Sequence, residues 1–136
     1  MRKTFVAWSV LGLFCAVALS GQCHAADDKV TLTGTFEWSH QAGSHPITAV
    51  FTPNGDKKWN VVYNFDWGAR GAQAWKGTAE GDLKTGTLKG EGLHPDGHRK
   101  FTFSGTIKDG KINCTHNEVT SGTAVATGTM TLKTAQ

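Results

Sequence analysis

Bulky apolar residues alternate with small polar residues along most of the chain, from about Val30 to Leu132. An amphipathic helix would repeat its apolar residues every three or four positions, and that spacing is almost absent. Alternation with a period of two puts successive side chains on opposite faces of a strand, so that one face is buried and the other meets water. The sequence therefore predicts an all-β domain of antiparallel strands.

The most apolar strand is expected between residues 59 and 67. Its odd positions hold Trp59, Val61, Tyr63, Phe65 and Trp67, and its even positions include asparagine and aspartate. Aromatic and β-branched residues favour extended backbone and pack well on a half-buried sheet. The odd face of this strand must be either protein core or the wall of a ligand cavity.

Turn signals divide the alternating region into about eight strands. Pro53-Asn54-Gly55-Asp56 and Asp109-Gly110 carry the Asn-Gly and Asp-Gly pairs typical of tight hairpins, and residues 39–46, SHQAGSHP, are expected to form a loop. Consecutive strands joined by short turns pair with their sequence neighbours. We therefore predict a small antiparallel up-and-down barrel of about eight strands, with an antiparallel β-sandwich as the alternative.

Glycines occupy the apolar positions of several predicted strands, two residues away from a bulky side chain. The pairs are Leu32 and Gly34, Trp75 and Gly77, Leu88 and Gly90, Phe103 and Gly105, and Gly128 and Met130. An inward glycine lets a strand coil sharply and leaves room for a neighbouring aromatic ring. Closing a small barrel requires both.

The stretch LTGTFEW, residues 32–38, is similar to the first strand of lipocalin and avidin barrels. The similarity is confined to these residues, and Phe36 stands where lipocalins carry a characteristic tryptophan. No second motif extends it along the chain. The similarity is compatible with a barrel and implies no ligand and no site residue.

The first 25 residues have the pattern of a secretory signal peptide. Arg2 and Lys3 precede an apolar run that ends at Leu19, and small residues lead to Ala25. The run is short for a membrane span. We predict cleavage near Ala25 and export to the periplasm or the extracellular space, with residues 26–136 as a single all-β domain. Lipidation of Cys23, which would anchor the chain, is the alternative.

Cleavage would also change the charge and the cysteine content. Without Arg2 and Lys3 the formal net charge falls from +3 to +1. No cluster of Lys and Arg accompanies the aromatic residues, which argues against a nucleic-acid partner. Cys114 would be the one cysteine left, so it cannot form an internal disulfide. It is expected to be either a buried small hydrophobe or an exposed thiol that links two copies.

Two groups of residues could support metal or nucleophilic chemistry. His94, Asp96 and His98 carry the imidazole and carboxylate ligands that zinc or copper accepts, although Pro-Asp-Gly within this stretch is also explained as a turn. Cys114 and His116 fall on the same strand face, where a thiolate and an imidazole could cooperate. Neither group is a complete catalytic constellation, so the sequence predicts no enzyme activity and no cofactor.

The aromatic residues form the strongest candidate site. The candidate ligand-binding residues are Trp38, Trp59, Tyr63, Trp67, Arg70 and Trp75. Such rings could line a cup for a flat apolar ligand or a sugar ring, with the charged group fixing its orientation. An eight-stranded barrel, however, is only just wide enough to be filled by side chains or to hold one small ligand.

Three functions remain open from the sequence. The first is an exported, non-catalytic binding module for a small apolar or sugar-like ligand or for a protein partner. The second is a structural, envelope-associated protein whose interior is filled. The third is a metal-binding protein or an enzyme that uses the histidines.

Overall fold

The structure, a computed structural model, describes residues 28–134. Its eight strands are β1 (Val30–Trp38), β2 (Gln41–Pro53), β3 (Lys58–Asp66), β4 (Ala72–Glu80), β5 (Gly86–Leu93), β6 (Lys100–Lys108), β7 (Lys111–Thr120) and β8 (Thr123–Thr134). A short 3₁₀ turn, η1 (Gly68–Arg70), lies between β3 and β4. Between residues 28 and 134 no helix is long and apolar enough to cross a membrane. The predicted signal peptide lies outside the described residues.

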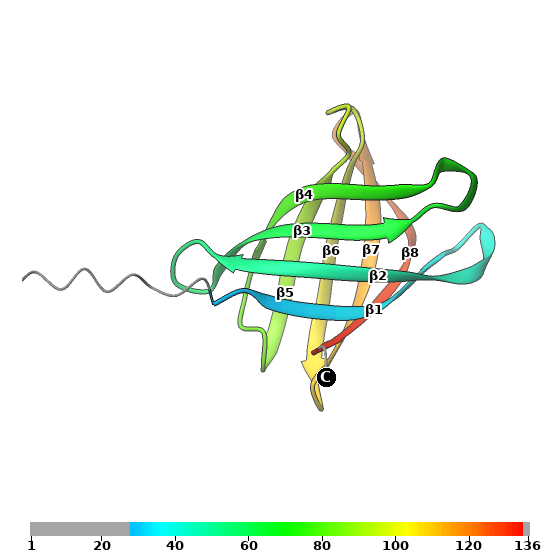
Figure 1. Cartoon of the computed structure of the whole chain (residues 1–136). Helices are drawn as coiled ribbons and strands as arrows, with labels where there is room; N and C mark the ends of the chain where they lie inside the picture. The colour runs from blue at the N-terminus through cyan, green and yellow to red at the C-terminus, as the bar shows by residue number, and fades with distance from the viewer. Residues whose placement is uncertain (1–27, 135–136) are drawn as a thin grey trace, which may run out of the picture.

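Every strand pairs with its neighbour in sequence, and β8 pairs with β1 to close the barrel. In Figure 1, β1 to β4 run across the front of the molecule and β5 to β8 cross behind them at a steep angle. All neighbouring strands are antiparallel. The predicted up-and-down barrel of eight strands is therefore confirmed, and a sandwich with open edges is excluded.

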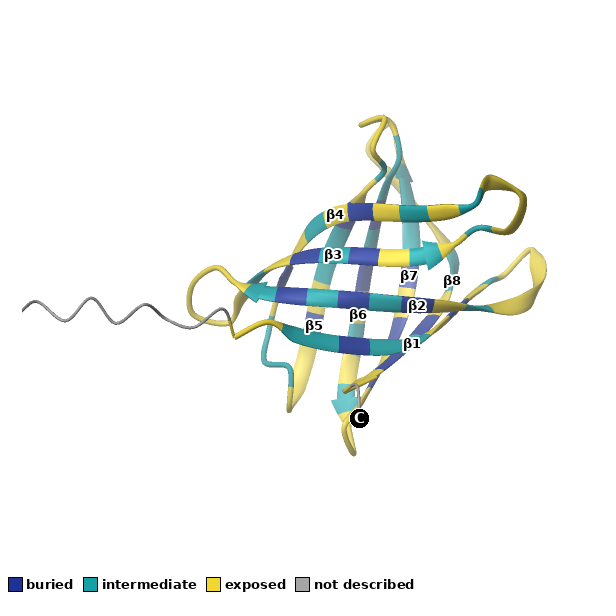
Figure 2. Cartoon of the chain, viewed as in Figure 1, coloured by how far each residue is buried: buried dark blue, intermediate teal, exposed yellow. Residues whose placement is uncertain are grey.

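The side chains that point into the barrel form one hydrophobic core. Figure 2 shows buried positions recurring along the strands, with exposed residues at the hairpin tips. The largest fully buried side chains are Phe51, Leu32, Leu88, Ile112, Leu132 and Val61. On β3, Val61 and Tyr63 are buried, and Trp59 and Phe65 pack against the core, as does Trp67 just after the strand. The period of two in the sequence thus corresponds to the inside and outside of the barrel.

Two of the inward glycines lie where neighbouring backbones approach closely. A Cβ atom on Gly34 would lie 1.8 Å from the carbonyl oxygen of Thr131 on β8, and one on Gly77 would lie 1.7 Å from that of Glu91 on β5. At Gly90 the added atom would also meet the ring of Phe103 at 2.6 Å. Glycine does leave room for an aromatic ring at Gly90, but at the first two positions the space belongs to a neighbouring strand.

The loop predicted over residues 39–46 is wrong. Only Ser39 and His40 form the turn, because β2 begins at Gln41 and pairs with the end of β1. This part of the hairpin extends beyond the core and is largely exposed. A strand without a buried face has no need for apolar alternation, so the sequence does not mark it.

The other predicted hairpins are confirmed, with one difference in size. Asp109 and Gly110 form a tight turn with φ values of 52° and 72°, both positive as a type I′ turn requires. The β2–β3 connection has four residues, 54–57, and is wider than a two-residue turn. There Asn54 N donates to Lys58 O at 2.8 Å.

Candidate functional site

The aromatic side chains gather at one end of the barrel. We call this the aromatic end; it is formed by the turn at 39–40 and the connections 67–71, 94–99 and 121–122. Contacting ring centroids there lie between 4.9 and 6.1 Å apart. The rings belong to Phe36, Trp38, Phe65, Trp67, Trp75 and Phe101. This cluster closes the core beneath the connections.

A cavity of about 70 Å³ lies inside the barrel, beneath these rings. Its walls are almost wholly apolar and include Phe36, Trp38, Tyr63, Trp75, Phe101 and His116. A dry cavity that accepts benzene measures roughly 150 Å³. The inner cavity is therefore too small for an aromatic ring, and side chains fill most of the barrel interior.

A wider cleft of about 530 Å³ opens at the aromatic end. Its walls include Trp38, His40, His45, Trp67, Arg70, Arg99 and Glu118. Trp38 borders both spaces, and its ring stacks on that of Trp67 with a centroid distance of 5.9 Å and an interplanar angle of 15°. The stacked Trp38–Trp67 pair therefore lies where the cleft meets the inner cavity.

The β3–β4 connection holds Trp67 and Arg70 together. Trp67 N donates to Gly71 O at 3.1 Å, and Arg70 N donates to Trp67 O at 3.2 Å. The carboxylate of Asp66 accepts a hydrogen bond from Gly68 N at 2.8 Å. These bonds close a small loop, and the Arg70 guanidinium carbon lies 4.9 Å from the centroid of the Trp67 ring.

Two arginines at the cleft differ in their partners. Arg99 forms a two-pronged ion pair with Glu118, at 3.0 Å from Nε to Oε1 and 3.2 Å from Nη2 to Oε2. It also lies 5.2 Å from the centroid of the Trp67 ring. Among residues 28–134, no carboxylate lies within ion-pair distance of Arg70. Arg70 therefore leaves a positive charge at the cleft.

Three buried ring nitrogens at the aromatic end have no hydrogen-bond partner within the described residues. They are Trp38 Nε1, His45 Nε2 and Trp75 Nε1. Trp75 is only 4% exposed and lines the inner cavity, whereas His45 lines the cleft and Trp38 lines both. A buried indole N–H normally has an acceptor, because burying it without one costs free energy. The aromatic end therefore contains unsatisfied polar atoms that are closed off from solvent.

The structure brings together five of the six residues predicted to bind a ligand. Trp38, Trp67 and Arg70 border the cleft, and Tyr63 and Trp75 line the inner cavity. Trp59 lies instead at the opposite end of the barrel, where its Nε1 donates to Gly81 O at 2.9 Å. It shares a strand face with Trp67, but eight residues of strand span roughly 26 Å.

The cleft residues that the sequence did not point to include His45, Arg99 and Glu118. Arg99 and Glu118 are 19 positions apart and meet because β6 pairs with β7 so that Phe101 faces Glu118. That register cannot be read before the pairing is known. His45 falls in the hairpin extension that lacks apolar alternation.

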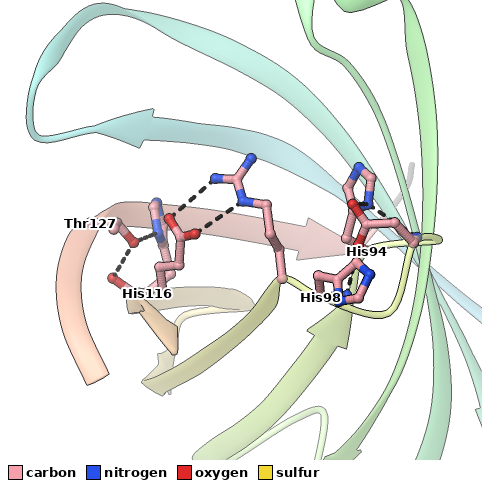
Figure 3. Close-up of polar contacts among 7 residues, drawn as sticks. His94, His98, His116 and Thr127 are labelled. Atoms are coloured by element: carbon pink, nitrogen blue, oxygen red, sulfur yellow. Dashed lines mark hydrogen bonds and ion pairs between the residues drawn. The ribbon is translucent and has the colours of Figure 1, made fainter. Parts of the chain in front are cut away.

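The histidines at 94 and 98 belong to a turn closed by Asp96. One oxygen of the Asp96 carboxylate accepts a hydrogen bond from His98 N at 2.8 Å, and the other lies 2.8 Å from His94 Nδ1 (Figure 3). The pKa of Asp96 is lowered, mainly by the backbone N–H of His98. Across the described part of the chain, no group of three His, Cys, Asp or Glu side chains could hold a metal ion. The geometry therefore gives the metal hypothesis no support.

Cys114 and His116 are both buried and do not act as a pair. Burial raises the pKa of the Cys114 thiol to about 12, so the thiol stays protonated and unreactive. Cys114 is thus the buried small hydrophobe of the two alternatives. His116 Nε2 donates to Glu37 O at 3.0 Å, and Nδ1 lies 2.8 Å from the Thr127 hydroxyl (Figure 3). A carbonyl only accepts, which assigns the proton of the neutral ring to Nε2.

His116 should make the fold sensitive to acid. Burial lowers its pKa below the ordinary value of 6.5, and hydrogen bonds to Glu37 and Thr129 oppose that shift. Well above pH 6.5, the pKa of an ordinary histidine, the His116 ring is neutral in both the folded and the unfolded chain. Below it the unfolded chain binds a proton that the folded chain resists, so stability falls by up to about 1.4 kcal/mol per pH unit.

Urea unfolding at about pH 7.5 and about pH 5.5 measures this loss. His116→Gln cannot titrate, so the stability difference between the two pH values should be smaller in the variant. An equal pH dependence in both proteins would show that other groups cause the acid sensitivity.

The fold and the cleft together define a class: a small closed antiparallel barrel with a cleft beside an aromatic cluster at one end. Comparison with protein-family models, with curated proteins and with solved structures finds no match for this chain.

Proposed function

We propose that the protein is an exported, non-catalytic binding protein that takes a small molecule at the aromatic end of its barrel. The observation that carries the proposal is a cleft of about 530 Å³ in which the stacked rings of Trp38 and Trp67 lie beside the guanidinium of Arg70. Small-molecule sites are typically clefts of roughly 300–1,000 Å³ with apolar walls and a few polar groups that fix orientation. The cleft falls within this size range, and its walls combine the two tryptophan rings with several polar and charged side chains.

The groups at the site favour binding over catalysis. Aromatic rings and arginines recognise a ligand without exchanging protons with it, and the imidazoles of His40 and His45 have no hydroxyl or thiol nucleophile in the cleft walls to activate. The one thiol of the barrel is held protonated by burial. The flat faces of Trp38 and Trp67 suit a flat ligand, and the cleft rather than the inner cavity has the volume to admit it.

A structural protein with a filled interior is the second candidate, favoured by the small volume of the inner cavity. Mass spectrometry distinguishes the two functions. Under native conditions, protein exported by its own host should carry a small molecule that is lost on denaturation. A bare monomer mass would favour the filled barrel.

The variant Trp67→Ala should weaken retention of that molecule about tenfold or more, because it removes one of the two stacked rings at the cleft. Trp59→Phe is the matched control, since this tryptophan packs at the far end of the barrel. Equal retention by both variants would place the ligand away from the aromatic end.

A further inference from the structure

The unpaired charge of Arg70 indicates the chemical class of the ligand. Arg70 lies on the exposed β3–β4 connection with its guanidinium beside the Trp67 ring. Among residues 28–134 no carboxylate lies within ion-pair distance of Arg70, and Glu118, which shares the cleft, is bound by Arg99. A guanidinium presents a planar fork of N–H donors that matches a carboxylate in two-pronged geometry. The cleft therefore offers one uncompensated cation to a ligand.

The hydrogen-bonding inventory of the cleft is biased toward donors. Arg70 and Trp38 Nε1 can only donate, and the best acceptor, the Glu118 carboxylate, is occupied by Arg99. A sugar carries hydroxyl groups that donate as well as accept, and the side-chain acceptors left in the walls are the amide of Gln41 and the imidazoles of His40 and His45. A ligand rich in acceptor atoms fits better.

The number of free charges favours a carboxylate over a phosphate. A phosphate monoester carries nearly two negative charges at neutral pH, whereas a carboxylate carries one. Arg70 alone can balance a single charge, because Arg99 is committed to Glu118. The flat surface of the Trp38–Trp67 pair in turn favours an aromatic ring next to that charge.

We infer that the cleft binds a flat aromatic monocarboxylate, whose carboxylate pairs with Arg70 while its ring packs against the Trp38–Trp67 pair. The inference rests on the proposed binding function and specifies its ligand. In this arrangement the ligand ring lies beside the indole of Trp38, which borders the cleft while its Nε1 is buried. The inner cavity stays empty of the ring, because it is too small.

The test uses 2-naphthoate and its neutral analogue 2-naphthamide, added to the exported protein labelled with ¹⁵N. The indole N–H signals of Trp38 and Trp59 are assigned by substitution with phenylalanine. Naphthoate should shift the Trp38 signal and leave that of Trp59 unchanged, because the Trp59 N–H already donates to Gly81 at the far end. The amide should bind about 10- to 100-fold more weakly, because it cannot form the charge-assisted hydrogen bonds between a carboxylate and Arg70.

Two variants test the contribution of the Arg70 charge to affinity separately from that of the aromatic rings. Arg70→Gln should reduce naphthoate affinity to about that of the amide, whereas Lys108→Gln should leave it within about twofold. Lys108 ends β6 at the opposite end of the barrel, so its variant loses the same charge at a remote place. Both side chains are exposed, and neither change disturbs the core.

The outcomes distinguish the inference from the function on which it rests. If naphthoate and naphthamide bind equally and Arg70→Gln has no effect, the binding function stands and the carboxylate is overturned. If neither compound shifts the Trp38 signal at millimolar concentration, both the aromatic ligand and the proposed use of this cleft are rejected.

Discussion

Replacing Gly34 with alanine should prevent the chain from closing into its barrel. The added Cβ atom would lie 1.8 Å from the carbonyl oxygen of Thr131 and 3.0 Å from the Cα of Leu132. Both atoms belong to the backbone of β8, which cannot move aside as a side chain can. β1 and β8 would have to separate and lose hydrogen bonds of the ladder that closes the barrel.

We expect Gly34→Ala to lose more than about 4 kcal/mol of stability, a large part of the roughly 5–15 kcal/mol available to a domain of this size. Circular dichroism and urea unfolding should show a chain that is largely unfolded or has lost cooperative unfolding.

Gly97→Ala is the matched control for this substitution. Gly97 lies in the β5–β6 connection with a φ of 76°, and its added Cβ would have no neighbour within 4 Å. The cost should be only the roughly 1–2 kcal/mol of placing alanine in the left-handed region. If Gly34→Ala unfolded at the same urea concentration as Gly97→Ala, the result would contradict the close approach of the β1 and β8 backbones at Gly34.

The fold could be predicted because its determinants are local. Alternation shows which residues of a strand face inward, and turn signals such as Asp109-Gly110 show where strands end. Eight strands in sequence with short connections leave few topologies, of which the closed barrel is one. The exception, residues 39–46, is a strand with no buried face, where the local signal disappears.

The candidate site could be predicted only in part, because it depends on position along the barrel axis. Alternation places Trp59 and Trp67 on the same face but cannot tell that they lie at opposite ends. The sequence does place Trp67 and Arg70 close together, because both lie in one short connection. Arg99 and Glu118 come from different strands, and their contact follows from the register of β6 and β7.

Phe51→Ala should produce the second large loss of stability, at the end of the barrel away from the cleft. Phe51 is 0% exposed, and its ring packs edge-on against Trp59 with a centroid distance of 6.2 Å. Truncating a fully buried phenylalanine removes its transfer free energy and leaves a cavity, which together cost about 3–5 kcal/mol. Urea unfolding measures the loss. Thr52→Ala, next in sequence but on the outer face, should cost less than about 1 kcal/mol.

Phe51→Ala also tests whether packing at one end of the barrel affects ligand affinity at the other end. In an up-and-down barrel the two ends share strands but not connections, so a cavity beside Phe51 leaves the Trp38–Trp67 pair in place. Folded Phe51→Ala should therefore bind naphthoate within about twofold of the unchanged protein, since sites that share no contacts are nearly additive. A loss of binding as large as that of Arg70→Gln would mean that packing at the far end sets the geometry of the cleft. The rigid closed core, rather than the connections alone, would then position the binding residues.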